Sequence, residues 1–144
     1  MSYAPFDTRA IAERLRATMP GLREVRCVVD VDSVRASAYF AAPGAYVLLP
    51  SETGGQAING ARVTPADTQF SVVMALTSFR ERRREAVTDE FFTLLAQVRA
   101  ALIGWTPQGI GMTAIRWRGG RVYDADASTF LWTEDYQLTH VLQA

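Results

Sequence analysis

Lysine is missing from this 144-residue chain, and cysteine and histidine occur only once each. All basic side chains are therefore arginines. Without lysine, the chain cannot form a Schiff base, a P-loop phosphate contact or a Ser–Lys pair. Because Cys27 is the only cysteine, neither an internal disulfide nor a multi-cysteine metal site can form. These absences exclude many common chemistries, and we predict no catalytic, cofactor-binding or metal-binding residues.

The chain also lacks net charge and long apolar runs. Its 15 acidic residues balance its 15 basic ones, whereas a dedicated nucleic-acid or anionic-membrane binder needs a net basic surface. No apolar run approaches the roughly 20 residues of a membrane span. The N-terminal sequence MSYAPFDTRA also lacks the pattern of a signal peptide. We expect a soluble cytoplasmic protein with no membrane contact and a single domain spanning residues 1–144.

The most strongly patterned stretch is Thr88–Trp105, which we predict to be a helix. Its apolar residues recur at spacings of four and three, so they share one helix face. Thr88 has the side chain of an N-cap, and Gly104 and Pro107 provide a stop. The predicted core-facing residues are Phe91, Leu95, Val98, Leu102 and Trp105.

This helix carries more apolar surface than one face requires. Phe92 and Ile103 lie on a second side, together with Ala96 and Ala100. One interpretation, which we favour, is that another helix of the same chain covers this shoulder. The other is a contact between subunits, because surplus apolar area on a surface helix usually meets a partner.

Periodicity and turn residues predict the other elements. The alternating Glu24–Val31 predicts a half-buried strand containing Cys27, and Phe70–Phe79 predicts a central strand with two apolar faces. Glu134 interrupts the apolar face of the last strand, which suggests a bulge or an edge position there. The remaining predictions are a helix over Phe6–Met19 with Asp7 as N-cap, a short helix over Ser33–Ala38, a strand over Ala45–Leu49 that Pro50 stops, a hairpin turning at Gly119-Gly120, and a last strand over Thr129–Leu142.

Two polar segments are candidate contact regions. Ser51–Pro65 reads as a long loop, with Asn59-Gly60 able to form a small hairpin inside it. The connector Arg80–Glu85 contains an arginine cluster, formed by Arg80, Arg82, Arg83 and Arg84. We favour a solvated loop for this cluster, then ion pairs between subunits, and DNA contact last because the chain is neutral.

The order of these elements predicts an α+β fold. We expect a mixed or mainly antiparallel sheet of about five or six strands, with two main helices packed on one side. The residues available for catalysis are few: His140 could serve a Ser-His-Asp or Cys27–His140 scheme, but no nucleophile-elbow motif accompanies it. We expect His140 to be a packing or interface residue.

Four motifs together resemble one family. They are PGAYVLLPSE at Pro43–Glu52, FSVVMALTSF at Phe70–Phe79, AALIGWTP at Ala100–Pro107 and STFLWTEDYQLTHVL at Ser128–Leu142. Their order and spacing resemble the tail terminator, or tail completion, proteins of bacteriophages, prophages and phage-tail-like particles. The resemblance implies a structural protein and not an enzyme. It implies a homo-oligomeric ring, typically a hexamer, that caps the head-proximal end of the tail tube and ends tube polymerisation.

The resemblance also implies partners and a location. The partners are other copies of the chain, the tail tube protein and a neck or connector protein, with DNA only passing through the ring. The location is the virion tail, reached from the host cytoplasm during assembly. Two alternatives stay open, namely a head–tail joining adaptor and a small hydrolase or binding domain that uses His140. Our candidate interface residues are Ser51, Glu52, Arg62, Arg80, Arg82, Arg83, Arg84, Phe92 and Ile103.

Overall fold

The structure is a computed structural model that describes residues 2–30, 32–35, 42–77, 84–125 and 129–143. For residues 77, 84–87 and 125 it describes the backbone but not the side chains. Three predictions fall partly or wholly outside these ranges. They are the second half of the short helix at 33–38, the end of the strand at 70–79, and the connector residues Arg80, Arg82 and Arg83.

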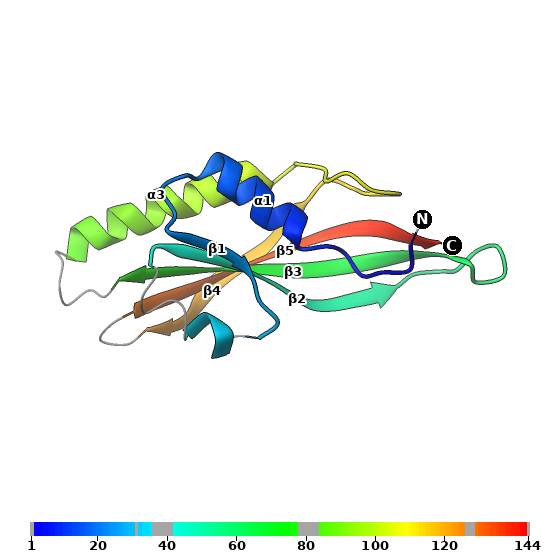
Figure 1. Ribbon diagram of the computed structural model, residues 1–144, viewed down its shortest axis with the longest axis horizontal. Coiled ribbons are helices and arrows are strands. Elements are labelled where there is room, and N and C mark those ends of the chain that lie inside the picture. Colours follow the sequence, from blue (N-terminus) through cyan, green and yellow to red (C-terminus); the bar gives the residue numbers. More distant parts are fainter. Residues whose placement is uncertain (1, 31, 36–41, 78–83, 126–128, 144) are drawn as a thin grey trace.

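Five strands form one mixed sheet with two helices on one face, so the predicted α+β class is confirmed (Figure 1). The strand order is β1-β2-β3-β5-β4. Strand β1 runs parallel to β2, and the other neighbours are antiparallel. The elements are α1 (Arg9–Thr18), β1 (Glu24–Cys27), β2 (Gly44–Gly54), β3 (Val63–Thr77), α3 (Arg84–Leu102), β4 (Arg116–Ala125) and β5 (Thr129–Gln143).

Helix α3 covers the sheet with the predicted face. Leu95, Val98 and Leu102 are buried, and Phe91 and Trp105 are partly buried. The helix ends at Leu102, and Gly104 follows with a φ of 82°, the left-handed conformation that glycine adopts at helix ends. Its start was predicted wrongly.

The helix begins at Arg84, so Thr88 lies inside it and is not the N-cap. The residues before Thr88 include Arg, Glu and Ala, which favour the helix and extend it upstream.

Helix α1 forms within the predicted range, but it begins at Arg9 and its N-cap position is Thr8, not the predicted Asp7. Ile11, Leu15 and Met19 are buried against the sheet. The Asp7 carboxylate accepts a hydrogen bond from the Arg9 amide at 3.0 Å, which satisfies a free N–H at the helix start. The helix ends before Pro20-Gly21, as expected.

Strand β3 is central and buried on both faces, as its two apolar faces predicted. Phe70, Val72 and Met74 belong to the main core beneath α1 and α3. Val73 and Ala75 belong to a smaller core on the opposite face. A short helical segment at residues 32–35 supplies the buried Val34 to this second core.

Two strand ends differ from the predictions. Strand β1 stops at Cys27, and Val29 is 93% exposed. Strand β2 does not stop at Pro50, because its pairing with β3 shifts between Leu48 and Ser51 and resumes beyond. This irregularity accommodates a proline, which has no N–H to give to the ladder.

Most of the predicted loop at Ser51–Pro65 is therefore strand. Residues 51–54 pair with residues 66–69, so backbone pairing with β3 prevails over a glycine-rich and polar sequence. The connecting segment covers only residues 55–62. Ile58 in this segment forms a bridge with Val63, the first residue of β3. In the turn between them, Asn59, Gly60 and Ala61 have positive φ angles. The small hairpin at Asn59-Gly60 is thus confirmed, and it projects from one end of the molecule (Figure 1).

The predicted hairpin at Gly119-Gly120 is wrong, because both glycines lie inside the continuous strand β4. Trp117 faces Tyr136 and Val122 faces Trp132, so Trp117 and Val122 are not partners. Gly120 does not form a turn. It has no side chain because Trp132 packs closely against it, and a Cβ at this position would lie 2.8 Å from Trp132 Cζ2.

Of the two expectations for Glu134, the edge position is wrong, but an irregularity does lie next to it, because the register shifts between Trp117 and Gly119 of β4, opposite Tyr136 and Asp135. Strand β5 is an internal strand that pairs with β3 without a shift. The register shifts fall in its pairing with β4.

Candidate functional site

Glu134 is the centre of a buried polar cluster on the helix-covered face of the sheet. It is 0% exposed, and its two oxygens accept hydrogen bonds from four side chains. The Arg99 guanidinium of α3 donates twice, at 3.0 and 2.7 Å. The donors from the strands are Trp117 Nε1 at 2.7 Å, Trp132 Nε1 at 2.8 Å and Tyr136 Oη at 3.3 Å.

This cluster explains how a charged residue can interrupt an apolar face. A buried carboxylate is tolerated when it is paired and its lone pairs are used. The hydrogen bonds from Arg99 to Glu134 raise the pKa of the guanidinium. Burial, together with the negative charge of Glu134, raises the pKa of the Tyr136 hydroxyl. Both groups therefore keep their protons, and Glu134 keeps its donors.

Glu52 and His140 form a second polar cluster near the hairpin end. One carboxylate oxygen of Glu52 accepts hydrogen bonds from the Phe6 amide at 3.1 Å and from the Thr68 hydroxyl, and it lies 2.7 Å from His140 Nε2. Burial of Glu52 acts to raise its pKa, but these three hydrogen bonds outweigh burial and leave the pKa below its usual value.

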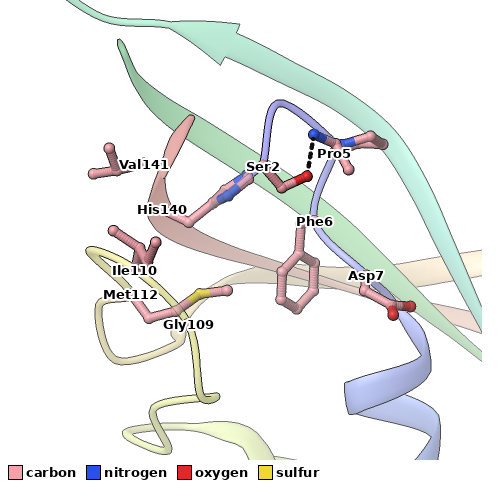
Figure 2. Close-up of a pocket in the computed structure, with 10 residues that line it drawn as sticks. Ser2, Pro5, Phe6, Asp7, Gly109, Ile110, Met112, His140 and Val141 are labelled. Atoms are coloured by element: carbon pink, nitrogen blue, oxygen red, sulfur yellow. Dashed lines mark hydrogen bonds between the residues drawn. The ribbon is translucent and has the colours of Figure 1, made fainter. Parts of the chain in front are cut away.

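Beside this cluster lies a cavity of about 280 Å³. Figure 2 shows Phe6 of the N-terminal segment on one side of the cavity, and His140, Ile110 and Met112 on the other side of it. The rings of Phe6 and His140 are 6.2 Å apart. The walls are mainly apolar, and the described lining contains no arginine to hold an anion.

The arrangement does not match nucleophilic catalysis. In a hydrolase triad the histidine stands between the hydroxyl and the acid. Here the acid stands in the middle, with His140 and the Thr68 hydroxyl both bound to the same oxygen of Glu52. Cys27 is on β1, which two strands separate from the β5 strand of His140. The cluster instead fastens the N-terminal segment to the sheet.

The third feature is an aromatic hollow between α3 and β5. It is lined by Phe91, Phe92, Leu95, Ala96, Arg99 and Trp132, and it encloses about 670 Å³. Phe91 packs edge-on against Trp132 with ring centroids 5.2 Å apart. On the neighbouring β4, Val122 pairs with Trp132 and is exposed. The hollow therefore continues into apolar surface on an edge strand.

The predicted interface residues are spread over several of these features. Phe92 is 62% exposed and Ile103 is 47% exposed, so our favoured interpretation, cover by a second helix, is wrong for both side chains. The reason is that α1 packs on the other flank of α3 and reaches neither residue. The subunit contact stays a prediction. Ser51 and Arg62 are exposed, Glu52 is engaged with His140, and Arg84 begins α3.

Sequence reasoning missed both polar clusters. In the sequence Glu134 is only a break in an apolar pattern, and its partners Arg99 and Trp117 lie 35 and 17 residues away. Glu52 and His140 are 88 residues apart. An acidic residue on an otherwise apolar strand face is a signal that a basic partner must be found, but the sequence does not say which one.

The described residues contain neither a candidate metal site nor a candidate membrane span. No group of three or more His, Cys, Asp or Glu side chains among them could hold a metal ion. Within the same residues, no helix is both long enough and apolar enough to cross a membrane.

Comparison with known structures shows that this fold occurs in another protein. A chain in the structure described as the virion of a native gene transfer agent (GTA) particle has a similar fold, with a TM-score of 0.57 and 15% sequence identity over 92% of each chain. No curated protein matches the sequence significantly.

The family comparison is more specific. The phage tail terminator protein family matches residues 1–144, the whole chain, and the protein belongs to that family. It is a family of structural phage tail proteins.

Proposed function

We propose that this protein forms a ring, a hexamer, that caps the head-proximal end of the tail tube. The ring ends tube polymerisation and presents a surface to a neck or connector protein. It acts in the virion tail, which it joins from the host cytoplasm, and DNA only passes through it. Membership of the tail terminator family over the whole chain supports this role.

The observation that carries the proposal is that this protein, a member of the family, has an aromatic hollow that no other part of its described chain covers. Phe92 stands 62% exposed on the outer flank of α3. A ring of identical subunits needs two different surfaces on each copy that fit each other. The hollow is an apolar surface of the kind that such contacts bury. The proposed role requires no catalysis. This agrees with the cluster at Glu52, where His140 and the Thr68 hydroxyl both contact the acid and the histidine does not stand between them.

The direct test adds purified protein to polymerising tube subunits and scores tube length by negative stain. We expect shorter tubes with a density at one end. Phe92→Asp places a charge on the hollow and should restore long tubes. Val29→Asp is the matched control, because Val29 is even more exposed but lies on a different surface. Unchanged tube lengths with the wild-type protein would contradict the proposal.

A gene disruption separates this role from that of a head–tail joining adaptor. Loss of a terminator should give overlong tubes in the lysate. Loss of a joining protein should instead leave tails of normal length beside separate full heads. Electron microscopy of the lysate distinguishes these two outcomes.

A further inference from the structure

We infer that the hairpin tip of one copy docks in the aromatic hollow of the next copy. We define the tip as Tyr3, Ile58 and Arg62, and the hollow as the six residues named above. The inference rests on the proposed function and deepens it, because it names the two surfaces that meet in the ring.

The tip is an apolar feature held in a fixed conformation. Ile58 is 57% exposed and Tyr3 is 54% exposed. Hydrogen bonds between the Ile58 and Val63 backbones, at 2.9 and 3.2 Å, fix the turn. The Tyr3 hydroxyl donates to the Arg62 carbonyl at 3.1 Å and attaches the N-terminal segment to it. A tip that is ordered before binding loses less entropy on docking.

The hollow is equally well ordered. Glu134 holds the indole of Trp132 and the guanidinium of Arg99, two of its lining residues. Its volume of about 670 Å³ lies within the range of roughly 300–1,000 Å³ for ligand pockets, so it has room for several side chains. Its wall is mainly apolar, with three aromatic residues among the six, which suits an isoleucine and a tyrosine.

The charges of the two surfaces are complementary. Within the described residues, no hydrogen bond or ion pair engages the Arg62 side chain, which is exposed. Asp89 is exposed on α3, three residues before Phe92 and therefore on the same side of the helix. Arg99 in the hollow is already paired with Glu134, so its charge is compensated and opposes Arg62 little.

The two surfaces lie toward opposite ends of an elongated molecule. In Figure 1 the hairpin is at one end, while the first half of α3 and the start of β5 are at the other. One chain therefore cannot fill its own hollow with its own tip. A contact between two different surfaces passes from copy to copy, and it leaves no free end only when it closes into a ring.

Cysteine cross-linking tests this contact, because Cys27 is the only native cysteine. In a Cys27→Ser background, Ile58→Cys and Ala96→Cys place one thiol on the tip and one in the hollow. Mixing the two single variants should give a disulfide-linked dimer. The double variant should give a ladder that ends at the number of copies in the ring. Val29→Cys replaces Ala96→Cys as the control and should give no link with Ile58→Cys.

Charge reversal gives an independent readout. Arg62→Asp should raise the concentration needed for half-assembly by roughly tenfold, and adding Asp89→Arg should restore most of the loss, measured by light scattering. Circular dichroism confirms that each variant is folded. An Ala96→Cys variant that links only to itself, showing a two-fold contact, would overturn the inference.

The inference and the proposed function can fail separately. Capped tubes that give no link between Ile58→Cys and Ala96→Cys would refute the tip-in-hollow contact and leave tube capping intact. A full ladder from a protein that does not shorten tubes would refute capping and leave the contact intact.

Discussion

Glu134 is a buried carboxylate and Glu52 a partly buried one, and the fold satisfies them in different ways. Glu134 uses both oxygens, is 0% exposed and has the guanidinium of Arg99 as a charged partner. Glu52 gathers three donors on one oxygen, among them a backbone amide, and keeps partial contact with solvent. The first is neutralised by an ion pair, and the second is stabilised mainly by hydrogen bonds.

The difference relates to what each carboxylate positions. Glu134 orients Trp132 and Arg99, which line the aromatic hollow. Glu52 binds the amide of Phe6 and so anchors the N-terminal segment, whose Tyr3 is part of the hairpin tip and donates to Arg62. Each cluster thus supports one of the two surfaces that we propose to meet between copies. Variants that disturb one cluster should affect its own surface first.

The largest effect is expected from Glu134→Ala. The variant removes the partner of Arg99 and leaves the hydroxyl of the buried Tyr136 and the indole N–H of the partly buried Trp132 without their acceptor. We expect a loss of about 3 kcal/mol in the free energy of unfolding, the lower end for a broken buried pair, because Arg99 can turn toward solvent. Urea denaturation measures this loss. Glu134→Gln keeps the shape and should lose less, whereas equal losses for both variants would show that the charge alone accounts for the stabilisation.

Gly120→Ala tests the same cluster by overpacking. A Cβ at Gly120 would meet the Glu134 carboxylate and lie 2.8 Å from Trp132 Cζ2. The ring must then shift, at a cost of about 1–3 kcal/mol. Gly21→Ala is the matched control, since nothing lies within 4 Å of its Cβ position. A thermal melt in which both variants behave alike would mean that Trp132 moves aside without cost.

The sequence was sufficient for elements whose own periodicity decides their structure. Helix α3, helix α1 and the central strand β3 follow from apolar spacing, because each must bury one or two faces of its own residues. The turn at Asn59-Gly60 also follows, since those residues accept a positive φ. The α+β class follows from the order of such elements.

The predictions from sequence were wrong where pairing with a neighbouring strand determines the local structure. Pro50 and the Gly119-Gly120 pair read as breaks, but pairing with β3 and β5 carries the strands through them. In both places the register shifts nearby, and the irregularity absorbs the unusual residue. Glu134, Arg99, Glu52 and His140 could not be joined by pattern, because their contacts cross 35 and 88 residues.

The smallest and most specific effect is expected from Glu52→Gln as a function of pH. The pKa of Glu52 is below its usual 4.5, because the hydrogen bonds from Thr68, His140 and the Phe6 amide outweigh burial. The folded state therefore prefers the ionised carboxylate. This stability is fully present above about pH 4.5, and it is lost as the pH falls through the lowered pKa.

We expect Glu52→Gln to lose about 1 kcal/mol at pH 7, because an amide oxygen still accepts some of these hydrogen bonds. The difference from the wild-type protein should shrink below about pH 4.5, as Glu52 itself becomes protonated. Urea denaturation across this pH range measures both curves, with Glu13→Gln on the exposed face of α1 as a surface control. A constant difference down to the most acidic pH would show that Glu52 acts through shape, and it would remove the contrast with the charge-paired Glu134.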